Sequence, residues 1–142
     1  MRKGIIIFII CVFVVMVMYI LGACKEVYGY EYDYSPNEMV MIGKVVQHEA
    51  GNQSELGKRL VIDTIMNRVE SPEFPNTVKE VLGQKGQYCD PKDYPPRWVY
   101  SLIAQEMYHR TNDKVLWYKT NGYHKYGIPI LQEGDHYFSG DE

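Results

Sequence analysis

Apolar residues between positions 39 and 49 recur at the period of an α-helix, and one acidic residue shares their face. The apolar members of this stripe are Met39, Ile42, Val45 and Val46. They precede Glu49 by ten, seven, four and three positions, offsets that bring side chains onto the same side of a helix. Because such a helix must bury its apolar side against other elements, the stripe predicts that Glu49 faces inward.

Local signals set both ends of this helix. Ser35-Pro36-Asn37-Glu38 places a Ser at the cap, a Pro at the first helical position and a Glu three residues after the cap, which is a capping box. Gly51 follows Glu49 by two residues and predicts a left-handed end. We therefore expect a helix at roughly 36–50, with Glu49 in its last turn beside a loop.

An inward-facing carboxyl group at this position has a chemical use. Burial in apolar surroundings disfavours the ionised form of a carboxyl group, and the negative end of the helix dipole acts in the same direction. A protonated carboxyl group is the general acid that protonates a glycosidic oxygen. In the alternative interpretation Glu49 is a last-turn residue that points to water, and its position in the sequence favours neither interpretation.

The later elements follow from the same signals. We expect helices from Ser54 to Ser71-Pro72, after the capping box Thr77-Val78-Lys79-Glu80 up to Gly83, and at about 96–110. Beyond Asn112 we expect short strands at 115–118 and 128–131, and a final edge strand at 134–138. This order predicts an α+β domain, with helices followed by a small antiparallel sheet.

The first 24 residues have the character of a targeting segment. A basic start, Met1-Arg2-Lys3, precedes an uncharged apolar run from Ile5 to Leu21. Leu21-Gly22-Ala23-Cys24 resembles a bacterial lipobox. Three outcomes stay open for residues 1–24: an uncleaved membrane anchor, a lipoprotein signal and a cleaved signal peptide. In each case the rest of the chain is extracytoplasmic, because the basic end stays inside.

We interpret residues 25–35 as a tether and residues 36–142 as one monomeric domain. The chain has 15 basic and 18 acidic residues and no basic patch, so nucleic acid is not expected as a partner. No sequence feature predicts a cofactor or a metal site, because there is no CxxC pair and no zinc-like Cys/His spacing.

Other enzyme classes fit less well. His48-Glu49 is no zinc protease motif, because H-E-x-x-H requires a His where Asn52 stands. Cys89 stands alone or pairs with Cys24 in an oxidising compartment. A peptidase built on Cys89 would need a distant histidine, and nothing in the sequence brings one near. The histidines concerned are His109, His124 and His136.

Several short segments occur in the order found in a known family. They are His48-Glu49-Ala50-Gly51, Ile65-Met66-Asn67-Arg68-Val69, Phe74-Pro75-Asn76-Thr77-Val78, Gly86-Gln87-Tyr88 and Gly134-Asp135-His136-Tyr137-Phe138. Over roughly residues 36–139 the chain resembles the SleB/CwlJ-type cell-wall hydrolases, which include the spore cortex-lytic enzymes. The resemblance implies a lysozyme-like fold and cleavage of peptidoglycan between N-acetylmuramic acid (MurNAc) and N-acetylglucosamine (GlcNAc).

The resemblance also implies roles for single residues. Family members that act as lytic transglycosylases use one essential Glu in an E-A motif, and the match gives that role to Glu49. The family motif E-A-R-G-E reads Glu49-Ala50-Gly51-Asn52-Gln53 here, so the Arg and the second acid are missing. The matched elements, together with aromatic residues able to stack on sugars, give the expected substrate-binding residues. These are Gln87, Tyr88, Tyr118, His136 and Tyr137.

The number of carboxylates decides between two mechanisms. An ordinary glycosidase needs a second carboxylate across the sugar. The candidates Asp90, Asp93 and Asp135 sit in no pattern that fixes them near Glu49. A lytic transglycosylase needs only one Glu, which protonates the glycosidic oxygen and then takes the proton of the C6 hydroxyl as a 1,6-anhydro ring closes. We expect this second mechanism; the alternative is a membrane-tethered peptidoglycan-binding module without activity.

Overall fold

The computed structural model describes residues 12–13, 16–17, 33–89 and 91–141. The predicted targeting segment, including Cys24 and the three outcomes that were left open, therefore lies almost wholly outside the described residues. None of the helices in the described part of the chain has the length and apolar character needed to cross a membrane. From Asp33 onward the chain forms one compact unit.

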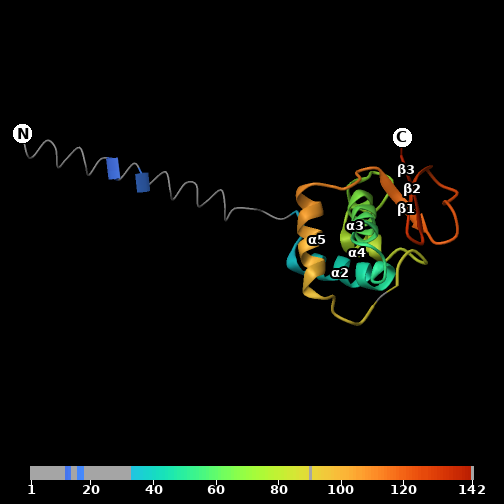
Figure 1. Cartoon of the computed structure of the whole chain (residues 1–142), viewed down its shortest axis with the longest axis horizontal. Helices are drawn as coiled ribbons and strands as arrows, with labels where there is room; N and C mark the ends of the chain where they lie inside the picture. The colour runs from blue at the N-terminus through green and yellow to red at the C-terminus, as the bar shows by residue number, and fades with distance from the viewer. Residues whose placement is uncertain (1–11, 14–15, 18–32, 90, 142) are drawn as a thin grey trace, which may run out of the picture. The chain divides into compact units, whose positions relative to one another are not determined.

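Within this unit the helices come first and the strands follow. The elements are α2 (Pro36–Ala50), α3 (Glu55–Glu70), α4 (Val78–Leu82), α5 (Arg97–Tyr108), β1 (Val115–Lys119), β2 (Ile128–Glu133) and β3 (His136–Gly140). Helix α3 lies between α5 and the sheet, and it contacts α2, α4, α5 and β1 (Figure 1). The predicted order of helices and a small antiparallel sheet is confirmed.

Helix α2 begins as its sequence predicts. The Ser35 hydroxyl accepts a hydrogen bond from the Glu38 N–H at 3.4 Å, and the Glu38 carboxylate accepts one from the Ser35 N–H at 2.8 Å. Ile42, Val45 and Val46 are buried in the core. The apolar stripe therefore faces the interior. Glu49, in the last turn of the helix, lies on the same face.

The end of α2 differs from the prediction. Gly51 has φ −58° and ψ −32°, so it is right-handed and not left-handed. A Cβ atom at residue 51 would lie 2.3 Å from the carbonyl oxygen of Gln47. Glycine is therefore needed at this position because the backbone approaches closely, and not because φ is positive.

Strand β3 occupies the centre of the sheet, so the prediction of an edge strand is wrong. The strand order is β1-β3-β2, and β3 pairs antiparallel with both neighbours. Phe138 lies opposite Tyr118 on β1 and Leu131 on β2. Because both of its edges are paired, β3 is the most buried strand of the sheet.

The end of α3 fixes the sheet to the helices through side-chain hydrogen bonds to backbone carbonyls. The Asn67 amide donates to the carbonyl oxygens of Asn112 at 3.0 Å and Val115 at 2.9 Å. Arg68 Nε donates to the Leu116 carbonyl oxygen at 2.6 Å. Both side chains are buried, so these bonds satisfy backbone carbonyl groups at the junction of α3 and the sheet.

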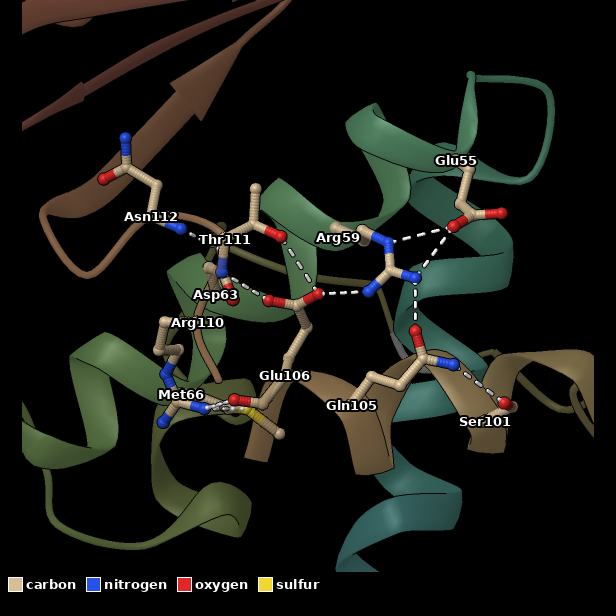
Figure 2. A network of polar contacts seen from close by, with 10 residues as sticks. All are labelled: Glu55, Arg59, Asp63, Met66, Ser101, Gln105, Glu106, Arg110, Thr111 and Asn112. Atoms are coloured by element: carbon tan, nitrogen blue, oxygen red, sulfur yellow. Dashed lines mark hydrogen bonds and ion pairs between the residues drawn. The ribbon is translucent and has the colours of Figure 1, made fainter. Parts of the chain in front are cut away.

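A buried carboxylate pair joins α3 to α5 (Figure 2). Glu106 is fully buried and accepts hydrogen bonds from Arg59 Nη1 at 2.5 Å and from the Thr111 N–H at 2.6 Å. Asp63 accepts the Asn112 N–H at 2.8 Å. Burial, followed by the nearby Glu106, raises the pKa of Asp63 to about 8. Asp63 therefore keeps its proton at neutral pH.

Asp63→Asn should flatten the pH dependence of stability. Because the pKa of Asp63 rises from 3.8 to about 8 on folding, the folded protein holds a proton that the unfolded chain releases. The free energy of unfolding therefore falls as pH rises through this window. Asparagine keeps an acceptor for the Asn112 N–H and does not titrate. We expect the melting temperature of Asp63→Asn, measured by circular dichroism, to rise relative to that of the parent as the pH increases from about 4 to 8. A constant difference between the two melting temperatures across that range would contradict the raised pKa of Asp63.

Candidate functional site

Glu49 lies half-buried in the last turn of α2 and faces a group of aromatic side chains. Its charge acts on the phenols of Tyr88 and Tyr118 and on the imidazole of His136. The stripe that packs α2 onto the core thus brings the carboxylate to residues from the loop after α4, from β1 and from β3. These segments are far apart in the sequence and meet only in the fold.

The two tyrosines beside Glu49 hold their protons firmly. Their ring centroids lie 6.5 Å apart. Burial, together with the charge of Glu49, raises the pKa of Tyr88 to about 12 and that of Tyr118 well above its usual value, and Arg68 opposes both shifts. Both hydroxyl groups are therefore neutral at physiological pH and can donate hydrogen bonds in a region that contains a carboxylate.

His136 completes this side of the site from the central strand. It is buried, and its ring centroid lies 5.0 Å from that of Tyr118. Burial lowers the pKa of His136, while the charges of Glu49 and Asp135 oppose the shift. The imidazole is therefore neutral at physiological pH and offers one donor and one acceptor nitrogen.

Arg68 contacts the ring of Tyr88 and was not among the residues that the sequence predicted for the site. Its guanidinium lies over the rings of Phe74 at 5.0 Å and Tyr88 at 5.4 Å. The side chain is buried although it carries a charge. The sequence does contain a signal for it, since an arginine on a helix of otherwise apolar, buried residues needs a specific partner.

Four buried polar atoms in this region have no hydrogen-bond partner within the described part of the chain. They are Tyr88 Oη, Tyr118 Oη, His136 Nδ1 and Arg68 Nη1. Buried polar groups are normally paired, because an unmade hydrogen bond costs about 1–3 kcal/mol. Their concentration beside one carboxylate suits a ligand that is rich in hydroxyl and amide groups.

Gln87 lies outside this cluster, on a neighbouring cavity. It is exposed and lines a surface cavity of about 430 Å³. The other lining residues are Phe74, Gln84, Lys85, Trp117, His124 and Tyr126. The Trp117 ring stacks on His124 with centroids 6.5 Å apart, and the Phe74 and Tyr126 centroids lie 5.8 and 6.2 Å from it. We call Trp117, His124 and Tyr126 the aromatic platform.

Tyr137 does not belong to the group of side chains around Glu49. It follows His136 on β3, so its side chain points to the opposite face of the sheet from His136 and Phe138. There it packs edge-on against Tyr123, with centroids 5.3 Å apart. Of the predicted substrate-binding residues, the structure therefore gathers Tyr88, Tyr118 and His136 around Glu49 and leaves Tyr137 apart.

The three acids considered as second carboxylates differ in position. Asp90 lies outside the described residues. Asp93 is exposed in the loop before α5. Asp135 is exposed in the turn between β2 and β3, where it accepts a hydrogen bond from Gln53 Nε2 at 3.1 Å. Of the described carboxylates, Glu49 is the one whose charge acts on both phenols.

A second set of side chains meets Glu49 from the solvent side. Potential ligand atoms of His48, Glu49 and Cys89 all lie within 4.8 Å of one another. His48 and Cys89 are exposed, and Cys89 forms no disulfide within the described part of the chain. Imidazole, carboxylate and thiol together form a donor set that could hold a metal ion.

Residues 52–139 match the family model of the cell wall hydrolases. The chain belongs to this family. The resemblance drawn from the sequence is thereby confirmed, and this cell wall hydrolase is an enzyme that acts on the cell wall. The matched range begins after Glu49, so the position of Glu49 in the site rests on the fold and not on the family match.

Two solved structures share the fold of this cell wall hydrolase. The catalytic domain of the Bacillus cereus SleB protein superposes with a TM-score of 0.66 at 24% identity, over 75% of this chain and 91% of that chain. The catalytic domain of the germination-specific lytic transglycosylase SleB from Bacillus anthracis gives the same TM-score and identity, over 75% of this chain and 97% of that chain. At this identity the likeness shows the fold. No curated protein matches the chain.

Proposed function

We propose that this enzyme cleaves the bond between MurNAc and GlcNAc in peptidoglycan as a lytic transglycosylase, with Glu49 as both acid and base. The observation that carries the proposal is the meeting of one half-buried carboxylate with four unpartnered buried polar atoms. The fold shared with a SleB protein described as a lytic transglycosylase supports the same reaction.

The chemistry needs one carboxyl group in two steps. In the first step Glu49 gives its proton to the glycosidic oxygen, the bond from that oxygen to C1 of MurNAc breaks, and GlcNAc leaves with a new hydroxyl group. In the second step the Glu49 carboxylate takes the proton from the C6 hydroxyl of MurNAc, whose oxygen bonds to C1. Glu49 ends protonated, no water is consumed, and the product carries a 1,6-anhydro ring.

The neighbours of Glu49 have binding and positioning roles in this scheme. The neutral phenols of Tyr88 and Tyr118 donate hydrogen bonds to sugar oxygens or to the carboxylate after the first step. The positive charge of Arg68 acts on both phenols and lies beside the same group of side chains. The neutral imidazole of His136 binds a sugar hydroxyl or amide group. A positioned acid of this kind accelerates a reaction by about 10²–10⁴-fold.

The geometry favours the mechanism with one carboxylate. A two-carboxylate glycosidase needs its second acid across the sugar from the first. Asp135 is exposed and held by Gln53, and Asp93 is exposed in a loop, so neither shares the buried surroundings of Glu49. We therefore assign the removal of the C6 hydroxyl proton to Glu49 as well.

The products of digestion test the mechanism. Purified sacculi are incubated with the enzyme, and the soluble muropeptides are separated and weighed by mass spectrometry. We expect 1,6-anhydro ends, which are one water lighter than the reducing ends left by hydrolysis. Reducing MurNAc ends would overturn the transglycosylase mechanism, and sedimentation with sacculi without soluble products would indicate a binding module.

The aromatic platform is proposed as a site for a sugar ring further along the glycan strand. Tyr126→Ala should weaken binding to peptidoglycan by roughly 2–10-fold, because stacking on an exposed aromatic ring contributes about 0.5–1.5 kcal/mol. The turnover rate should change little, since Tyr126 makes its ring contacts with Trp117 and His124 of the platform. Tyr94→Ala is the matched control, because Tyr94 is also exposed and lies outside this cavity. Equal effects on binding of both variants would count against the platform.

Residues 1–24 are proposed to carry the domain out of the cytoplasm and to hold it at the membrane, where its substrate lies. The basic start and the apolar run support this location. Protease added to intact protoplasts should remove the domain, while a cytoplasmic marker protein survives. Survival of the domain until the cells are lysed would contradict the proposal.

A further inference from the structure

Three different metal-binding side chains meet at the solvent side of Glu49, and the proposed cleavage reaction uses only one of them. His48 and Glu49 come from the last turn of α2, and Cys89 comes from the loop after α4. One potential ligand atom from each lies within 4.8 Å of the other two. Cys89 follows His48 by 41 positions and Glu49 by 40, so only the fold reveals the group.

The donor set matches zinc. Zn²⁺ binds imidazole nitrogen and carboxylate oxygen at about 2.0–2.2 Å and thiolate sulfur at about 2.3 Å in tetrahedral geometry, so ligand atoms lie roughly 3.4–3.7 Å apart. The three atoms need to approach by about 1 Å, which side-chain rotation supplies because His48 and Cys89 are exposed. Thiolate and imidazole together select zinc over magnesium or calcium.

Two surrounding features favour a cation at this point. The site lies at the C-terminus of the 15-residue helix α2, the negative end of its dipole. The buried hydroxyl of Tyr118 has no hydrogen-bond partner among the described residues, and it interacts electrostatically with both Glu49 and Cys89. A protonated phenol in that place can donate to a metal-bound carboxylate or thiolate, which is how outer groups orient metal ligands.

We propose that His48, Glu49 and Cys89 bind one Zn²⁺ ion and that this ion switches off cell-wall cleavage. The inhibitory effect rests on the proposed role of Glu49, whereas the metal site stands on its own geometry. On binding, Cys89 loses its thiol proton to solvent, His48 ligates through a neutral nitrogen, and the Glu49 carboxylate is engaged by the metal. A carboxylate held in this way cannot carry the proton that the glycosidic oxygen requires, so removal of zinc restores the acid.

Metal binding is measured first, without reference to activity. The full-length protein is titrated with Zn²⁺ by calorimetry and with Co²⁺ by absorption, where a thiolate-to-cobalt charge-transfer band reports ligation by cysteine. We expect one ion per chain. Cys89→Ser should remove the band. Cys89→Ser and His48→Gln should each weaken zinc binding by more than roughly 10–100-fold, which is the usual effect of losing a residue that only hydrogen-bonds to a metal ligand. His109→Gln is the matched control, because His109 is exposed elsewhere and should leave binding unchanged.

Activity is then measured with and without zinc. Zinc should inhibit the parent enzyme and a chelator should reverse the inhibition, while Cys89→Ser and His48→Gln remain active and lose the sensitivity. No binding, binding unaffected by Cys89→Ser, or activation by zinc would each overturn the proposal. If Glu49→Gln retains cleavage while the parent shows the cobalt band, the assignment of Glu49 as the acid fails and the metal site survives. If Glu49→Gln is inactive and the parent binds no metal, the metal site alone fails.

Discussion

Glu49→Gln should abolish the release of muropeptides from peptidoglycan while the protein stays folded. Glutamine has nearly the shape of glutamic acid, but it has no proton to give and cannot serve as a base. Removal of a positioned general acid costs about 10²–10⁴-fold in rate, and here both steps depend on the same group. The rate is measured as loss of turbidity of sacculi and as soluble product by mass spectrometry.

The controls separate loss of chemistry from loss of structure. The melting temperature of Glu49→Gln should stay close to that of the parent, because the side chain is only half-buried in the last turn of α2 and glutamine has nearly the same shape. Asp135→Asn is the matched carboxylate control, since Asp135 is exposed and lies in the turn before His136. It should remain active. Parental activity in Glu49→Gln overturns the role of Glu49, and inactivity of folded Asp135→Asn indicates a two-carboxylate mechanism.

Glu106→Ala should lower the free energy of unfolding by about 3–5 kcal/mol, the usual cost of removing one partner of a buried ion pair. Glu106 is fully buried and accepts hydrogen bonds from Arg59 and from the backbone and hydroxyl groups of Thr111 (Figure 2). Alanine leaves these donors without their acceptor and opens a cavity between α3 and α5. Urea unfolding followed by circular dichroism gives the change directly.

Glu55→Ala is the matched control for this prediction. Glu55 also pairs with Arg59, at 2.8 Å, but its side chain is 68% exposed. Because solvent screens an exposed pair, the loss should be only about 0.2–1 kcal/mol. Equal losses in Glu55→Ala and Glu106→Ala would show that burial of the carboxylate does not set the stability of this network.

Local patterns in the sequence were sufficient for the helices. The capping box at Ser35 and the apolar stripe gave the bounds of α2 and the inward direction of Glu49, because both depend on residues within about four positions of one another. The motif order was sufficient for the family, which the match over residues 52–139 confirms. The conformation of Gly51 was predicted wrongly. Either a positive φ or a close contact with the Gln47 carbonyl can require glycine, and the residue type alone does not distinguish the two.

Local sequence patterns did not predict which distant segments pair with one another. The alternation of residues 134–138 indicates a strand, but only hydrogen bonds to both β1 and β2 make β3 the central strand. The separation of Tyr137 from His136 onto opposite faces likewise follows from the pleat once that pairing exists.

The sequence by itself determined the family, the α+β order and an acid on the buried side of α2. The tertiary structure alone decided which side chains surround that acid: two buried phenols, a buried imidazole and arginine, and the Cys89 thiol beside His48. The reason is physical. Helix signals act through neighbouring residues, whereas a site is made by contacts across the fold, which leave no period or spacing along the chain.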